Sequence, residues 1–308
     1  MKLQELIQEY LRNRKALGWR RCPSDGHLGT FGRFVGMNAD LDDVRPEQVE
    51  AFLKGKGEIT LSWHHKYGAL KSFYRWLFDR GYIEHSPLPT IVPRQPPAFV
   101  PYIYSIEELR SILQAFDEVC CSSLLLDPIT AKTMVLTLYG CGLRRREAIN
   151  LDGTNIDFEQ STLTIRDTKF LKTRLVPFGV QLGRELKAYS RAKSDNSEEA
   201  FFVNRKNRRI DCQILQRYFR RACVRAGVRR EDSKRFQPRL HDLRHSFAVH
   251  RLTSWYERGD DVQRLLPHLS TYLGHASVRN TQAYLTMTPA LLDEANKRFE
   301  QYMERGMQ

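Results

Sequence analysis

A chain of 308 residues, 41% hydrophobic and 28% charged, has the composition of a folded protein rather than a disordered one, and its length allows two ordinary domains. The formal net charge of +13 favours an acidic partner, and nucleic acid is the commonest such partner for a globular chain. The six cysteines form no CxxC pair, which argues against a zinc ribbon or a redox motif.

The first part of the chain is predicted to be helical. Apolar residues recur at helical spacing at residues 3–19, 44–53 and 63–78. Prolines then follow at high density from Pro87 to Pro101, which excludes regular helix and sheet and stiffens the chain. We therefore predict a helical first domain, a proline-rich linker and a second domain, at residues 1–86, 87–101 and 102–308.

The second domain is predicted to open with helices. Ser105 and Glu108 have the spacing of a capping box, in which each side chain can accept a hydrogen bond from the other residue's backbone N–H. Asp127 before Pro128 is typical of a helix start, and this helix is predicted to run to Tyr139, before a glycine-rich break. A further helix is predicted from near Arg144.

A small β element is predicted next. Residues 162–166 alternate like a strand, and residues 174–177 resemble its partner. The loop between them carries Lys169 and Lys172. From Asp211 a helical pattern returns and continues to the end of the chain. The predicted fold is therefore mostly α with a small β-hairpin or sheet, in two domains.

One segment carries the most specific chemical signal. His241 and Arg244 are three residues apart, so on a helix they share one face. A titratable imidazole beside a permanent, fork-shaped cation suits a phosphate diester, whose negative charge grows in its transition state. Tyr284 follows a second histidine, His275, and supplies a possible nucleophile. The pattern indicates phosphoryl transfer on a polyanion.

Other interpretations of these residues remain open. His241 and His245 also have the spacing of a zinc-binding helix, but Asp242 replaces the general-base glutamate of that motif, and Arg244 would place a cation beside the metal. Arg144 lies in a run of three arginines, which is usually solvated, and a loop lysine such as Lys169 is usually exposed. A tyrosine such as Tyr284 is by default part of the core.

The order of the motifs resembles the tyrosine recombinase (phage integrase) family. The segments that carry the resemblance are Gly142-Leu143-Arg144-x-x-Glu147, the hairpin lysine, His241-x-Leu243-Arg244-His245, Leu273-Gly274-His275 and Thr281-Gln282-x-Tyr284. The resemblance implies a C-shaped two-domain clamp, with a helical core-binding domain that binds DNA and a mixed α/β catalytic domain that ends in a tail helix. The long interval from Arg244 to Leu273 resembles recombinases encoded by transposons or genomic islands.

The resemblance also implies a role for each site residue. Tyr284 would attack the scissile phosphate to give a 3′-phosphotyrosyl link and a free 5′-hydroxyl. Arg144 and Arg244 would bind the non-bridging oxygens, which stabilises the transition state. His275 would donate a hydrogen bond to the phosphate, and His241 would manage the proton of the nucleophile. Lys169 would protonate the leaving oxygen, and Glu147 would orient the cluster.

Partners follow from the same resemblance. The partner would be double-stranded DNA, bound at two sites by a homo- or hetero-tetramer, with accessory or partner recombinases in some systems. The resemblance implies no membrane partner and no metal or nucleotide cofactor. Backbone phosphates would be contacted by Arg217, Arg220, Arg221 and Arg225. The segment after the nucleophile, with Leu291, Leu292, Ala295 and Phe299, would dock on a neighbouring protomer or pack on its own domain.

The expected activity is site-specific DNA strand exchange that integrates, excises or transposes mobile DNA. The alternatives are a type IB topoisomerase, a DNA-binding accessory homologue that does not cleave, and a metal-dependent hydrolase. The N-terminal segment lacks the apolar core of a signal peptide, and no apolar run is long enough to span a bilayer. We therefore expect a cytoplasmic, nucleoid-associated protein with reduced thiols.

Overall fold

The computed structural model describes residues 1–18, 23–55, 59–96, 99–121, 123–166, 173–193, 199–231, 237–286 and 293. The chain divides into two compact units, Met1–Phe99 and Val100–Gln308. Each unit has its own hydrophobic core. Within the described ranges, no helix is long and apolar enough to cross a membrane.

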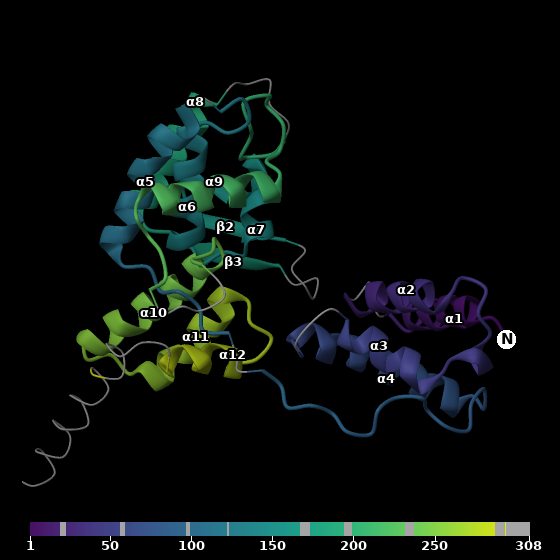
Figure 1. The fold of residues 1–308 in the computed structure, drawn as a ribbon. Helices are drawn as coiled ribbons and strands as arrows, with labels where there is room; N and C mark the ends of the chain where they lie inside the picture. Colours follow the sequence, from purple (N-terminus) through teal and green to yellow (C-terminus); the bar gives the residue numbers. More distant parts are fainter. Residues whose placement is uncertain are drawn as a thin grey trace, which may run out of the picture. The chain divides into compact units, whose positions relative to one another are not determined.

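Unit 1 is a small helical domain, coloured purple to blue in Figure 1. Its elements are α1 (Leu3–Ala16), α2 (Pro23–Val35), the 3₁₀ turn Leu41–Asp43, α3 (Pro46–Lys54) and α4 (Leu61–Asp79). The three predicted helices are confirmed. Helix α2 was not predicted because three glycines dilute its apolar pattern. One of them, Gly32, faces α1: a Cβ there would lie 2.4 Å from Gln4 Oε1, so glycine allows the two helices to approach closely.

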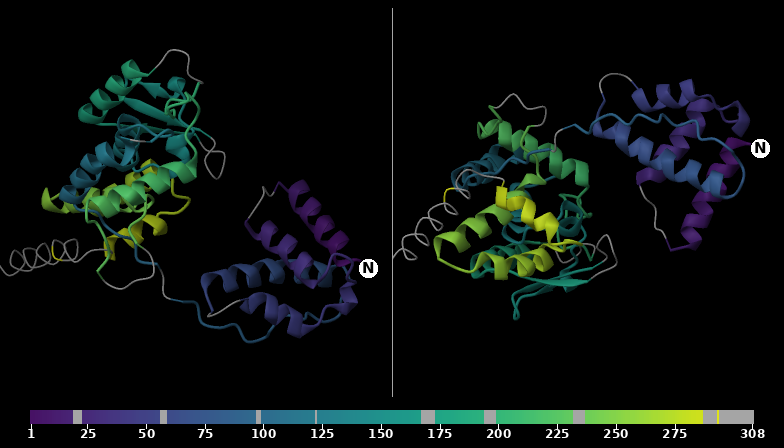
Figure 2. Two further views of the ribbon diagram at one scale, coloured as in Figure 1. Left: turned by 45° about the horizontal axis from the view of Figure 1, so that its top comes forward. Right: turned by 90° about the horizontal axis from the view of Figure 1, so that it is seen from below.

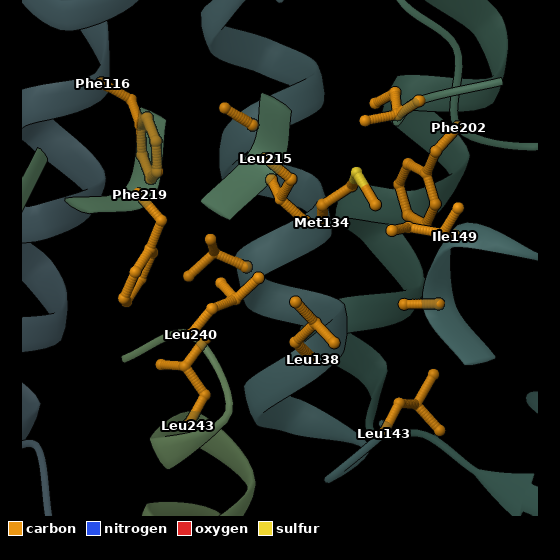
Figure 3. Close-up of a cluster of buried hydrophobic side chains, with 14 of the residues drawn as sticks. Phe116, Met134, Leu138, Leu143, Ile149, Phe202, Leu215, Phe219, Leu240 and Leu243 are labelled. Atoms are coloured by element: carbon orange, nitrogen blue, oxygen red, sulfur yellow. The ribbon is translucent and has the colours of Figure 1, made fainter. Parts of the chain in front are cut away.

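Unit 2 is built around α6. Its helices are α5 (Ile106–Cys121), α6 (Pro128–Gly140), α7 (Arg145–Ile149), α8 (Val180–Ala192), α9 (Cys212–Arg225), α10 (Asp242–Glu257), α11 (Val262–Leu273) and α12 (Arg279–Gln282), with 3₁₀ turns at Gly153–Asn155 and Ala283–Thr286. Most of α6 is buried, because α5, α8 and α10 pack around it. Figure 3 shows Met134 and Leu138 of α6 among Phe116, Leu215 and Phe219 of the neighbouring helices.

The predicted helix starts of unit 2 are confirmed. Ser105 and Glu108 form the capping box, with backbone-to-side-chain distances of 2.8 and 3.1 Å. The Asp127 carboxylate accepts from the backbone N–H of Thr130 at 2.8 Å at the start of α6. Helices α5 and α9 lie side by side in both views of Figure 2.

The sheet has the antiparallel order β1-β2-β3, with strands Ile156–Asp157, Thr162–Ile165 and Arg174–Pro177. The two predicted strands are confirmed, and Leu163 pairs with Val176, both fully buried. Strand β1 and helix α8 were not predicted. The prediction of helix from residue 211 to the end was too broad, since the described residues between α9 and α10 are not helical and Gly227 has a left-handed φ of 71°.

A separate hydrophobic cluster lies between α10 and α11. Phe247 and Leu252 of α10 pack with Leu266 and Leu273 of α11, and Tyr284 closes this cluster from the 3₁₀ turn Ala283–Thr286. The packing holds the ends of α10 and α11 and the tyrosine together. It therefore positions the residues of the candidate site.

Candidate active site

Arg144 caps α7, and its side chain is held at two points. Its backbone N–H donates to Glu147 Oε2 at 2.8 Å, and its Nη1 donates to Glu147 Oε1 at 2.8 Å. Its Nη2 donates to the Gly274 carbonyl, also at 2.8 Å. The guanidinium is thus tied both to its own helix and to the end of α11, and it remains half-exposed.

Arg244 lies deeper in the site. Its residue is 3% exposed, and its two terminal nitrogens donate to the Gly142 carbonyl at 2.7 Å and the Leu273 carbonyl at 2.6 Å. Burial and the charge of Arg144 lower the pKa of Arg244 to about 10, so it stays protonated at neutral pH. A guanidinium has five N–H donors, so these two bonds leave capacity for an anion.

Two glycines make this arrangement possible. Gly142 has a φ of 57°, and a Cβ there would lie 2.6 Å from Phe247 Cδ1 and 2.9 Å from Leu273 Cδ2. Gly274 has a φ of 69°, and a Cβ there would lie 2.9 Å from Arg174 Nη1. Larger residues would therefore displace the carbonyls that hold both arginines.

Tyr284 lies beside these cations. It is 3% exposed, and its ring centroid is 5.6 Å from that of His245 and 6.0 Å from that of His275. Burial raises the pKa of Tyr284, while the charge of Arg244, its hydrogen bonding to the phenol and the charge of Arg144 act in the opposite direction. The phenol oxygen therefore lies where two arginines favour its ionised form.

The two predicted site histidines flank the arginines. His275 Nδ1 lies 2.8 Å from Thr281 Oγ1, a buried hydroxyl. Burial, followed by the charges of Arg244 and Arg144, lowers the pKa of His275 to about 4. His241 lies at the N-terminal end of α10, and the residue as a whole is exposed. Desolvation of its imidazole by neighbouring groups, followed by the charge of Arg244, lowers the pKa of His241. Both histidines are thus favoured in the neutral form, in which an imidazole can donate or accept one proton.

Sequence reasoning missed Arg174. This residue begins β3 and donates to both oxygens of Glu147, at 3.0 Å from Nη1 and 2.8 Å from Nη2, while its Nε donates to the Tyr272 carbonyl at 2.9 Å. Burial would raise the pKa of Glu147, but Arg174 and then Arg144 lower it to about 2. The available signal was the alternation of β3, which places Arg174 on the same face as the buried Val176.

His245 also lies in the site, although it was predicted only as part of the family motif and as an alternative metal ligand. Its ring centroid lies 5.1 Å from that of His241, and it also neighbours the Tyr284 ring. Burial and His241 lower the pKa of His245 to about 4. Its Nδ1 is buried, and no hydrogen-bond partner for it is present in the described part of the chain. Nor do the described residues include a group of three His, Cys, Asp or Glu side chains that could hold a metal ion.

The remaining predicted residues lie elsewhere. Lys169 and Lys172 fall outside the described residues, and so do Leu291, Leu292, Ala295 and Phe299. The α9 arginines are exposed. Among them, Arg225 pairs with Glu118 of α5 and Arg221 lies over the Tyr218 ring. The structure thus brings together Arg144, Glu147, His241, Arg244, His275 and Tyr284.

Comparison with known proteins identifies the class. The sequence model of the phage integrase family matches residues 105–290. A Sinorhizobium fredii protein named as an integrase/recombinase, y4rB, is 33% identical over 309 residues, which cover 98% of each chain. Tyrosine recombinase XerA of Pyrococcus furiosus is 32% identical over 254 residues, covering 80% of this chain and 77% of that one.

The fold is shared with a solved structure. The Tn1549 transposon integrase, in a complex with a circular intermediate DNA, superimposes with a TM-score of 0.71 at 15% identity, covering 98% of this chain and 99% of that one. The chain belongs to the phage integrase family. It is a tyrosine-type, site-specific DNA recombinase, and the comparisons do not favour the topoisomerase or accessory-protein alternatives.

Proposed function

We propose that this recombinase breaks and rejoins DNA through a covalent link between Tyr284 and a strand 3′-phosphate. The observation that carries the proposal is the position of the Tyr284 phenol beside Arg244, within a cluster that also holds Arg144, His241 and His275. An isolated tyrosine has a pKa of about 10, so it is a poor nucleophile at neutral pH. Burial raises the pKa of Tyr284 further, and the charges of Arg244 and Arg144 act against that rise.

The proposed first step follows from the positions of these groups. Tyr284 Oη attacks the scissile phosphorus. Its proton leaves through His245, whose ring neighbours that of Tyr284, or through His241, whose ring neighbours that of His245. Arg144 and Arg244 bind the non-bridging oxygens as negative charge grows. The bond to the 5′-oxygen breaks, and the reverse attack by a 5′-hydroxyl of a partner strand restores the phosphodiester.

Supporting roles are assigned to groups that would not react. His275 donates a hydrogen bond to the phosphate, with its ring oriented by Thr281. Glu147 fixes Arg144 without taking a proton, because a carboxyl with a pKa of about 2 stays ionised throughout the neutral range. Lys169 is proposed to protonate the leaving 5′-oxygen.

The proposed substrate is duplex DNA bound by an assembly of protomers. Relatives of known structure include a lambda integrase tetramer on a Holliday junction and a XerH recombinase on its difH substrate. These support a tetramer on two DNA sites, built with or without a partner recombinase. The likeness to a transposon integrase and the long interval between Arg244 and Leu273 favour a role in moving a mobile element. The α9 arginines are proposed to contact backbone phosphates.

The experiment needs a DNA site, which can be sought in fragments from both sides of the gene by a gel-shift assay. Nicked versions of a bound fragment then act as suicide substrates, because the short strand 3′ of the cleavage point diffuses away. The parent chain should form a covalent complex on a denaturing gel, and Tyr284→Phe should bind equally but form none. A normal covalent band from Tyr284→Phe would refute the assignment.

The general acid has its own test. Lys169→Ala should cleave slowly on normal DNA but recover on a 5′-bridging phosphorothiolate, whose sulfur leaves without a proton. Lys172→Ala is the matched control from the same loop. Slow cleavage by Lys172→Ala that the sulfur substrate rescues, with Lys169→Ala unaffected on normal DNA, would transfer the role to Lys172.

A further inference from the structure

A strongly basic pocket adjoins the candidate active site. Its volume is about 410 Å³, and it is lined by four arginines, Arg144, Arg145, Arg146 and Arg239, with Gln216 and His241. Arg144 and His241 also belong to the catalytic cluster, so the pocket is continuous with the place where the scissile phosphate is proposed to bind. Arg145, Arg146 and Arg239 have no assigned role in the reaction.

The charges of this pocket are unbalanced on the side that faces solvent. Among its described lining residues, four carry a positive charge and none a negative one. The carboxylates that pair with Arg144 and Arg239 are Glu147 and Asp242, and their side chains are only 7% and 1% exposed. Asp242 binds the Arg239 guanidinium at 2.9 Å and so fixes its direction.

The remaining arginines are available to a ligand. The Arg145 guanidinium donates to the side-chain carbonyl of Gln216, an uncharged acceptor that orients the arginine without neutralising it. Arg146 is exposed. Guanidinium groups recognise phosphate oxygens in a bidentate manner, so a concave set of four is suited to a phosphate group rather than to an uncharged base.

We infer that this pocket binds the backbone phosphodiester next to the scissile phosphate on the cleaved strand. The inference rests on the proposed function. The scissile phosphate is proposed to lie on Arg144 and Arg244. The next phosphate along the same strand must lie close by, and the pocket begins at Arg144 and His241. Contacts to that neighbour would fix the register of the scissile phosphate against Tyr284.

The first test measures how DNA binding depends on salt. Arg145→Gln should lower the slope of log affinity against log salt by about 1, because one phosphate contact is lost. Its affinity should fall on the order of tenfold, the usual size of a charged hydrogen bond. The matched control is Arg184→Gln, which removes the same charge from an exposed position on α8 outside the pocket and should change both values less.

The decisive test places single neutral methylphosphonates at each phosphate of the bound fragment. At one phosphate adjacent to the cleavage point, the substitution should weaken binding about tenfold for the parent chain and for Arg184→Gln, but hardly at all for Arg145→Gln. Equal penalties in all three chains at both adjacent positions would overturn the inference. Arg146→Gln provides the same comparison should Arg145→Gln fail to fold.

The outcomes separate this inference from the proposed function. If the methylphosphonate penalty is the same in the parent chain and in Arg145→Gln, while the parent chain still forms the covalent complex, the pocket assignment alone is refuted. If Arg145→Gln removes the methylphosphonate penalty but the parent chain forms no covalent complex, the cleavage mechanism alone is refuted. Titration with inorganic phosphate gives a third comparison. Saturable phosphate binding that Arg145→Gln abolishes, together with equal methylphosphonate penalties in all chains, would assign the pocket to a free phosphate and overturn the inference.

Discussion

Replacing Arg174 by glutamine would remove two of the bonds that hold Glu147. The Glu147 side chain is 7% exposed and that of Arg174 is 10% exposed, so the pair is largely shielded from solvent. The pKa of Glu147 is about 2, against an ordinary 4.5, and about 1.36 kcal/mol per unit gives about 3 kcal/mol for the favourable contribution of its partners net of the cost of burial. Arg174 is the largest of the stabilising partners, so its removal should cost about 2–3 kcal/mol, near the lower end of the range for breaking a buried ion pair.

This stability should depend on pH in a defined direction. The pKa of Glu147 is depressed in the folded state, so its contribution is fully present above pH 4.5 and is lost as the pH falls from 4.5 through about 2. At pH 7, Arg174→Gln should lower the unfolding temperature of unit 2 by about 4–10 °C. The difference from the parent chain should shrink as the pH falls below 4.5.

The assay is scanning calorimetry of the full chain, with the transition assigned to unit 2 by pulse proteolysis and mass spectrometry. Arg184→Gln is the charge-matched control and should shift the transition little. Cleavage by Arg174→Gln should fall on the order of 10²-fold with DNA affinity largely kept, because Arg144 loses its fixed partner. An unfolding temperature within 1 °C of the parent at pH 7, or a difference that stays constant down to pH 3, would refute the reasoning.

Three further predictions concern the same site. Gly142→Ala should destabilise unit 2 by about 1–3 kcal/mol in denaturant unfolding and slow cleavage, because its Cβ would meet Phe247 at 2.6 Å and its φ is positive; a neutral substitution would contradict this packing. Arg244→Lys should lower the cleavage rate on the order of 10²- to 10³-fold in single-turnover assays, since lysine lacks the fork that bonds two carbonyls and a phosphate; cleavage within a few-fold of the parent would mean that the phosphate binds elsewhere. The pKa of His245 is lowered to about 4, so between pH 6.5 and 4 the unfolded chain binds more protons and stability should fall by at most about 3 kcal/mol as the pH drops; a slope in thermal unfolding that His245→Gln leaves unchanged would exclude this source.

Much of the candidate site could be predicted from the sequence because its residues lie in short local motifs. Arg144 and Glu147 are three apart at a helix start, and the glycine before them marks the break after α6. The spacing of His241 and Arg244 likewise predicts a shared helix face. In these places local geometry is sufficient, since one helical turn brings the side chains together.

Contacts made across long sequence distances could not be predicted in this way. The bonds from Arg174 to Glu147 and from Arg144 to the Gly274 carbonyl join residues 27 and 130 apart in the chain. The rings of His245 and Tyr284 are also neighbours, although Tyr284 comes from a later turn of the chain. Helix α2 was missed for a related reason: its glycines weaken the apolar pattern but allow it to pack closely on α1, a benefit visible only in the folded unit.

The most direct test of the central claim is to map the covalent link. The complex trapped on a nicked suicide substrate would be digested with trypsin and nuclease, and the nucleotide-bearing peptide sequenced by mass spectrometry. We expect the nucleotide on Tyr284, joined through a 3′-phosphate and absent from the Tyr284→Phe chain. A link to another tyrosine, to a serine or to a 5′-phosphate would contradict the mechanism proposed for this site.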